Sequence, residues 1–126
     1  MKQTIFIVED DADISGLVVH LLEAEDFRVR AFGRTSTVLA EAERSRPASF
    51  LLDIMLPGGD GLELCRRIRK HKQSKYTYVI IITALIGKKD YLEGMEAGAD
   101  DFVTKSQFGD ALMPLIQRRF LQPQIA

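Results

Sequence analysis

Acidic side chains follow two apolar runs of this 126-residue sequence. Glu9 and Asp10 come directly after the run at residues 5–8, and Asp53 comes directly after the run at residues 49–52. Carboxylates that gather away from water repel one another, so a fold that collects them commonly binds a cation. Oxygen ligands without clustered histidine or cysteine favour Mg²⁺, or Mn²⁺ in its place, over zinc.

Two other polar side chains end apolar runs further along the chain. Thr83 follows residues 78–82, and Lys105 follows residues 102–104. Because the functional edge of an open parallel sheet is the carboxyl end of its strands, we expect the hydroxyl and the ammonium to face the carboxylates. Taken singly, an acid after a strand often only caps the next helix, as we expect for Asp11. Convergence from several strands favours a functional site.

Short apolar runs alternate with segments of helical periodicity along the chain. The expected strands are residues 5–8, 27–32, 49–52, 78–82 and 102–104. The expected helices are residues 14–22, 35–44, 64–68, 88–98 and about 110–120. This alternation predicts a (βα)5 fold of the α/β class: a doubly wound, five-stranded parallel sheet with helices on both faces.

Several side chains of the expected helices have predicted positions. In the fourth helix, we expect Leu92 and Met95 to face inward and Gly98 to cap the C-terminus. Pro114 fits the last helix only if that helix begins near Asp110, because proline is tolerated in a first turn.

Composition and charge restrict the class of protein. The sequence is 46% hydrophobic and 28% charged, which is ordinary for a globular fold, and its net charge of -1 argues against a strongly basic nucleic-acid binder. The single cysteine, Cys65, excludes an internal disulfide and is expected in the core. No apolar run approaches the roughly 20 residues of a membrane span, and no signal peptide is evident. We therefore expect a cytoplasmic protein forming one domain over residues 1–126.

The near-neutral average hides an asymmetry between the two halves of the chain. Residues 1–60 hold 6 basic and 11 acidic side chains, whereas residues 61–126 hold 11 basic and 7 acidic ones. Part of the basic surplus is a run without acids, made of Arg66, Arg67, Arg69, Lys70, Lys72 and Lys75. We expect a solvated helix face there, with contact to a partner protein or nucleic acid as the alternative.

Four motifs, in order and covering essentially the whole chain, resemble the receiver domain of two-component response regulators. They are residues 5–11 (IFIVEDD), 51–61 (LLDIMLPGGDG), 82–84 (ITA) and 99–105 (ADDFVTK). The resemblance implies a flavodoxin-like sheet with strand order 2-1-3-4-5. It also implies that residues 1–126 are a single receiver domain and that the chain contains no output domain.

The resemblance implies a role for each acidic residue. Asp53 would be the phosphoacceptor, attacking the phosphohistidine of a sensor histidine kinase or phosphotransfer protein. Glu9, Asp10, Asp53 and the backbone carbonyl of Met55 would hold Mg²⁺. Such a protein is not an enzyme in the usual sense, because it catalyses only its own phosphorylation and dephosphorylation.

The resemblance also implies how the signal leaves the site. Lys105 and Thr83 would contact the phosphoryl oxygens, and Thr83 and Phe102 would then move as switch residues. The surface of the fourth helix, fifth strand and fifth helix would change, acting on a downstream effector protein or an output domain outside this chain. It could also form a dimer on phosphorylation. Direct binding to nucleic acid or a membrane is not expected.

The main departure from the family pattern lies directly after Lys105. Ser106 stands where the family usually has a proline in a cis peptide bond, so the Lys105–Ser106 bond is either trans or strained. Met55 and Leu85 are apolar at positions that can assist an attacking water, which predicts slow loss of the phosphoryl group. The alternatives are a degenerate receiver that acts only through protein contacts and a Mg²⁺-dependent phosphatase with an aspartate nucleophile.

Overall fold

The computed structural model describes residues 2–56, 59–84 and 87–121, and within residues 59–60 only the backbone. Five parallel strands form one sheet in the order β2-β1-β3-β6-β7. Their bounds are β1 Thr4–Val8, β2 Arg28–Phe32, β3 Ser49–Leu52, β6 Tyr78–Thr83 and β7 Asp101–Thr104. These are the five expected strands, and the expected order 2-1-3-4-5 is confirmed.

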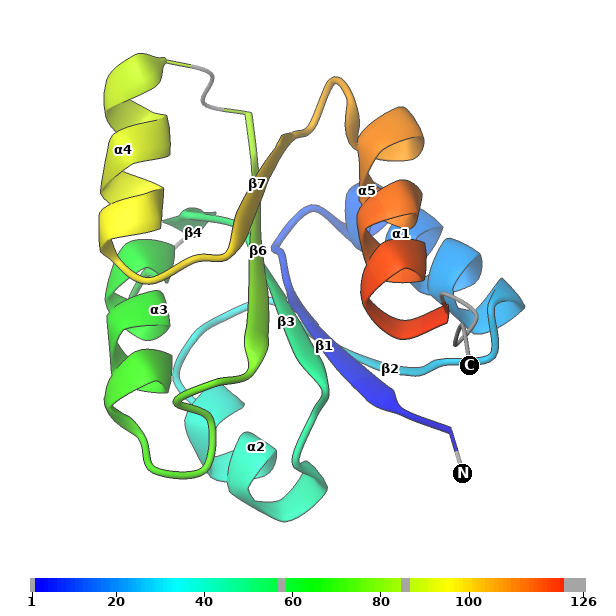
Figure 1. The fold of residues 1–126 in the computed structure, drawn as a ribbon, viewed down its shortest axis with the longest axis horizontal. Coiled ribbons are helices and arrows are strands. Elements are labelled where there is room, and N and C mark those ends of the chain that lie inside the picture. Colours follow the sequence, from blue (N-terminus) through cyan, green and yellow to red (C-terminus); the bar gives the residue numbers. More distant parts are fainter. Residues whose placement is uncertain (1, 57–58, 85–86, 122–126) are drawn as a thin grey trace, which may run out of the picture.

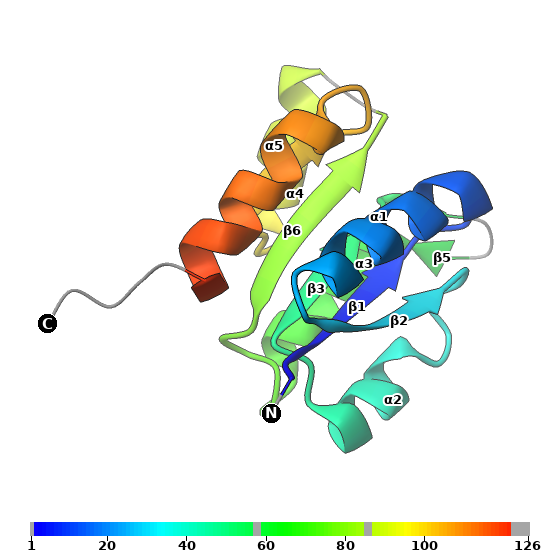
Figure 2. The same cartoon turned by 90° about the vertical axis from the view of Figure 1, so that its right-hand side faces the viewer.

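Helices cover both faces of the sheet (Figure 1). Their bounds are α1 Ala12–Ala24, α2 Val38–Ser45, α3 Gly61–Lys70, α4 Lys88–Glu96, α5 Phe108–Ile116 and the π-helical turn η1 Gln117–Leu121. The helices α1 and α5 lie over one face (Figure 2), and α2, α3 and α4 lie over the other. Among the described residues, none of the helices has the length and apolar character that a membrane-spanning segment requires.

The central strands are apolar on both faces because each face packs against helices. In β1, Phe6 belongs to the core cluster shared with α2 and α3, whereas Ile5 and Ile7 belong to the cluster shared with α1 and α5. This division follows from the two-residue period of a strand. Ile7 pairs with Leu51 of β3, so the register brings the ends of β1 and β3 level.

A small feature that the sequence did not predict follows β3. Met55–Leu56 (β4) and Gly59–Asp60 (β5) pair as a two-stranded antiparallel sheet. Because α3 begins directly afterwards at Gly61, this hairpin lies between the end of β3 and the next helix.

The inward face of α4 differs from the prediction. Gly98 has the expected positive φ of 110°, and Met95 packs against the core. Leu92, in contrast, is 52% exposed, so its expected inward orientation is wrong. Gly94 faces the sheet instead, because a Cβ atom there would lie 2.8 Å from Cδ1 of Ile81. The close approach of α4 to β6 needs a residue without a side chain, which hydropathy does not reveal.

The start of α5 also differs from the prediction. The helix begins at Phe108, not near Asp110, so Pro114 lies in its second turn. Proline has no N–H to donate to the carbonyl of Asp110, and the chain then continues as the π-helical turn η1.

The basic run of residues 66–75 is not uniformly solvated. Arg69 turns inward, where its Nε donates to the carbonyl of Gly98 at 2.7 Å and its Nη2 to Oδ2 of Asp100 at 2.8 Å. Its Nη1 donates to the carbonyls of Lys75 and Thr77. One guanidinium therefore connects α3 to the loop before β6 and to the turn between α4 and β7.

Replacing Arg69 with methionine is expected to lower the free energy of unfolding by about 2–3 kcal/mol, because the Asp100 carboxylate and the part-buried carbonyls of Gly98 and Thr77 lose a charged donor. The matched change Arg66→Met, on the exposed face of the same helix, is expected to stay within about 0.5 kcal/mol. Urea unfolding followed by circular dichroism measures both. Equal losses in the two variants would contradict a structural role for Arg69.

Candidate functional site

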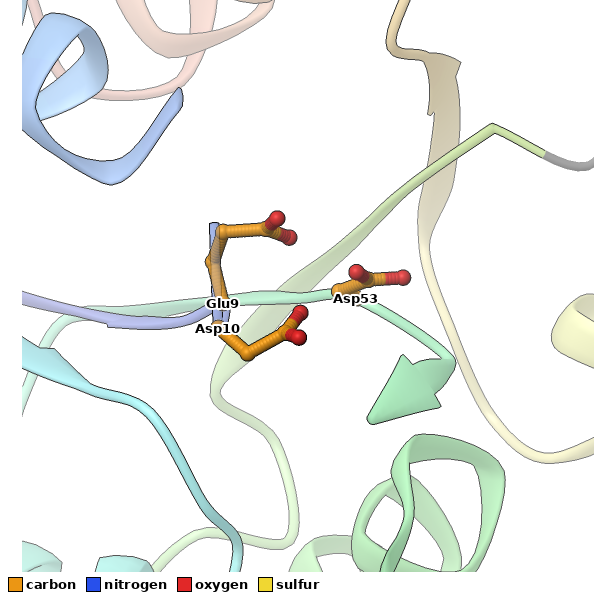
Figure 3. Close-up of side chains that lie close together, drawn as sticks. All are labelled: Glu9, Asp10 and Asp53. Carbon is orange, nitrogen blue, oxygen red and sulfur yellow. The ribbon is translucent and has the colours of Figure 1, made fainter. Parts of the chain in front are cut away.

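Three carboxylates lie together at the carboxyl edge of the sheet. Glu9 and Asp10 follow β1 and extend toward Asp53, which follows β3 (Figure 3). One oxygen from each of the three lies within 4.8 Å of the others. The amide of Asp53 donates to the carbonyl of Val8 at 2.9 Å, so pairing of the two strands sets this proximity.

Lys105, which follows β7, reaches two of these carboxylates. Its Nζ lies 2.7 Å from Oε1 of Glu9 and 2.9 Å from Oδ2 of Asp53. The side chains of Glu9 and Asp53 are only 2% and 1% exposed, so these are ion pairs with little competition from water. Asp10, in contrast, is exposed. The predicted meeting of Glu9, Asp10, Asp53 and Lys105 is therefore observed.

The remaining carboxylate oxygens differ in how well they are bound. Oδ1 of Asp53 accepts the N–H of Met55 at 2.9 Å, and Oε1 of Glu9 also accepts the N–H of Asp11 at 3.2 Å. Oε2 of Glu9 is buried and has no hydrogen-bond partner among the described residues. A buried carboxylate oxygen without a donor, beside two further carboxylates, fits a hard divalent cation such as Mg²⁺.

Among the described residues of the site, the carboxylates outnumber the positive charges, and the pKa of Glu9 is shifted. Burial, together with the carboxylate of Asp53, raises the pKa of Glu9 to about 7, although Lys105 opposes the shift. Since the ordinary value is 4.5, this group favours the folded state most at acidic pH, and its contribution falls as the pH rises through about 7. Burial lowers the pKa of Lys105, but Glu9 and Asp53 outweigh it and raise that pKa above its usual value.

Two backbone features hold Asp53 in place. The Met55 amide orients one carboxylate oxygen, while the Met55 side chain is 61% exposed. At Gly61 a Cβ atom would lie 2.1 Å from the carbonyl oxygen of Asp53 and 2.7 Å from Cα of Ile54. The first residue of α3 must therefore be glycine for the loop to pack this closely. Sequence reasoning did not single out Gly61, although its place shortly before the helix expected at residues 64–68 was an available signal.

Thr83 and Phe102 lie on the strands beside the acidic cluster. Thr83 is fully buried at the end of β6, and its carbonyl accepts the N–H of Lys105 at 2.8 Å. Phe102 is partly buried in β7, with its ring 5.6 Å from that of Tyr91 on α4. It therefore lies between the sheet and α4.

The sequence predicts that the peptide bond between Lys105 and Ser106 is either trans or strained. This bond is trans, as are the other peptide bonds of the described residues. A cis bond before a residue other than proline costs about 3–4 kcal/mol, which explains the preference. The trans bond still lets Lys105 reach both buried carboxylates. Leu85, predicted to influence phosphoryl lifetime, lies outside the described residues.

Cys65 takes no part in the site. Its side chain is fully buried on the inward face of α3, as predicted. Burial raises the pKa of the thiol to about 11, so at neutral pH it is protonated and unreactive.

These observations define a class of protein: an α/β module whose acidic, lysine-paired pocket opens at the carboxyl edge of its sheet. A sequence profile of the response regulator receiver domain matches residues 5–117. The response regulator PleD of Caulobacter vibrioides is 38% identical over 105 residues, which are 83% of this chain and 23% of PleD. The chain therefore belongs to the response regulator receiver domain family, a module of two-component signalling in which phosphoaspartate and Mg²⁺ are general.

Other relatives agree with this assignment. The sensory transduction protein RegX3 of Mycolicibacterium smegmatis is 38% identical over 102 residues, which are 81% of this chain and 43% of RegX3. The chain thus spans less than half the length of these two relatives. The BeF3-activated N-terminal receiver domain of Klebsiella pneumoniae RstA has a TM-score of 0.83 and 30% identity, covering 96% of this chain and 100% of that one. The predicted family and flavodoxin-like fold are confirmed.

The raised pKa of Glu9 can be tested in metal-free protein by carbon NMR of the side-chain carboxyl group. Wild type is expected to titrate near pH 7. Asp53→Asn should lower this pKa because it removes a neighbouring negative charge, whereas Lys105→Met should raise it because it removes the ammonium. Titration of wild type near 4.5, or shifts of the same sign in both variants, would contradict this account of the site.

Proposed function

We propose that this chain is a phosphorylation-dependent switch in which Asp53 accepts a phosphoryl group from a phosphohistidine. The observation that carries the proposal is the environment of Asp53. Its carboxylate is buried, one oxygen is held by the Met55 amide and the other by Lys105, and Glu9 and Asp10 lie beside it. Phosphoryl transfer depends mainly on such positioning and on charge stabilisation.

In the proposed reaction, a carboxylate oxygen of Asp53 attacks phosphorus and forms an acyl phosphate. The phosphorus–nitrogen bond of the phosphohistidine breaks, and its electron pair leaves with the imidazole. Glu9, Asp10, Asp53 and the Met55 carbonyl would hold a divalent cation, which would supply positive charge to neutralise the carboxylates and the transferring group. The ammonium of Lys105 pairs with a phosphoryl oxygen as a compact positive charge.

The same contacts provide a route for signalling. Lys105 binds Glu9 and Asp53 in the unphosphorylated chain, so a new phosphoryl group competes for an ammonium that is already engaged. We propose that the Thr83 hydroxyl binds another phosphoryl oxygen and that Phe102 turns inward in response. Phosphorylation would thereby shift an equilibrium at the α4–β7–α5 face.

The proposed partners follow from this role. A cytoplasmic sensor histidine kinase or phosphotransfer protein would supply the phosphoryl group to the single receiver domain formed by residues 1–126. A downstream effector, or an output domain outside this sequence, would read the α4–β7–α5 face, which could also pair with a second copy.

Incubation with acetyl phosphate and Mg²⁺ is expected to give a stable phosphoprotein, visible as a mass increase in intact-protein mass spectrometry. Asp53→Asn should abolish the adduct because it removes the nucleophile. Asp10→Asn should reduce the rate about tenfold or more, because one cation ligand loses its charge. Chelation of Mg²⁺ should have a similar effect.

Asp11→Asn is the matched control. Asp11 caps α1 by accepting the amides of Asp13 and Ile14, and asparagine keeps that function, so phosphorylation should be unchanged. No adduct on wild type would favour a degenerate receiver acting only through protein contacts. Steady hydrolysis of the donor without an adduct would favour a phosphatase.

The phosphoryl group is expected to be lost slowly, with a half-life of minutes or longer, because Met55 offers no polar group to orient an attacking water. Met55→Asn should shorten the half-life, since an amide at this exposed position can hold such a water. Decay measured by mass spectrometry after removal of the donor checks this. A wild-type half-life of seconds would contradict it.

A further inference from the structure

A basic surface between α2 and α3 takes no part in the acidic site. It consists of Arg66, Arg67 and Lys70 on α3, His71 after that helix, and Leu39 on α2; we call it the α2–α3 surface. An open hollow of about 300 Å³ lies on it, lined by Leu39, Arg67, Lys70 and His71. The C-terminal end of α3 lies at the opposite end of the sheet from the strand carboxyl ends that carry the acidic site (Figure 1).

Two cations of this surface have no acidic partner among the described residues. Arg67 and Lys70 are exposed, and among the described residues neither has an ion pair. Arg66 has only a long pair of 3.6 Å with Glu63. Arg69, from the same run, donates its hydrogen bonds within the fold, to Gly98 and Asp100. Arg69 therefore stabilises the fold, whereas Arg67 and Lys70 form no ion pair among the described residues.

An apolar side chain forms part of the hollow. Leu39 is partly buried and packs against the core cluster beneath α2 and α3. Beside it, Nε2 of His71 lies 2.7 Å from Oε1 of Glu43, while Nδ1 accepts the N–H of Gln73 at 3.3 Å. Because Nδ1 accepts, Nε2 carries the proton and donates to Glu43. This pair fixes one wall of the hollow by connecting α2 to the end of α3.

We propose that the α2–α3 surface docks an acidic segment of a partner protein, with one apolar side chain of that segment seated over Leu39. Carboxylates flanking the apolar residue would pair with Arg67 and Lys70. We infer this partner from charge complementarity, because the exposed cations Arg67 and Lys70 next to the apolar Leu39 match an acidic, amphipathic peptide. Leu39 gives the hollow an apolar contact that a protein side chain can fill and a phosphate backbone cannot, so a protein segment fits better than nucleic acid.

The test uses the unphosphorylated chain and a fluorescent synthetic peptide in which leucines alternate with glutamate-rich segments. Amide chemical-shift mapping should confine its contacts to α2, α3 and the loop after α3, and anisotropy should give a salt-sensitive affinity. R67E/K70E should weaken binding about tenfold or more. The matched double charge reversal K88E/K89E, on exposed lysines of α4, should change it by less than about twofold.

Two further probes separate the alternatives. A peptide with serine in place of leucine should bind more weakly, because it loses the apolar contact with Leu39. A mixed-sequence DNA duplex should not compete. The proposal is overturned if the acidic peptide fails to bind, if both double variants weaken it equally, or if the duplex binds more tightly through Arg67 and Lys70. R67E/K70E should still be phosphorylated at the wild-type rate, so failure of docking is distinguishable from failure of the proposed phosphoacceptor role.

Discussion

The ion pairs between Lys105 and the buried carboxylates of Glu9 and Asp53 are the interaction on which the rest of the structure depends. Two carboxylates removed from water share one ammonium, and one oxygen of Glu9 has no donor at all among the described residues. Such a group of charges is unfavourable unless surrounding structure holds it in place. The central strands, apolar on both faces, provide that support by fixing the ends of β1, β3 and β7.

This incomplete neutralisation is also what makes the site useful. In the proposed function, a pocket that is short of positive charge would attract a cation, and a newly attached phosphoryl group would redirect the engaged lysine. Phosphorylation of Asp53 would then change the partners of Lys105. The Lys105 amide donates to the carbonyl of Thr83, and Phe102 packs against Tyr91 of α4. Through these contacts, the proposed change would reach β6, β7 and α4.

Basic residues of the second half of the chain serve different purposes, although the sequence presents several of them as one run. Arg69 satisfies backbone carbonyls and Asp100 within the fold, whereas Arg67 and Lys70 remain exposed and line a hollow next to Leu39. Lys105 lies at the acidic edge instead. The near-zero net charge is therefore the sum of separate local imbalances, each with its own physical role.

Sequence alone determined the alternation of strands and helices, the strand order through family resemblance, and the candidates Glu9, Asp10, Asp53, Thr83 and Lys105. The fold is confirmed, and Glu9, Asp10, Asp53 and Lys105 lie together, because strand periodicity and the carboxyl-edge rule depend on local pattern and topology. Tertiary structure alone decided that Leu92 faces solvent, that Gly94 and Gly61 permit close backbone contacts, and that Arg69 turns inward. It also decided the trans bond before Ser106. Each of these depends on distances between segments far apart in the chain, which no local pattern contains.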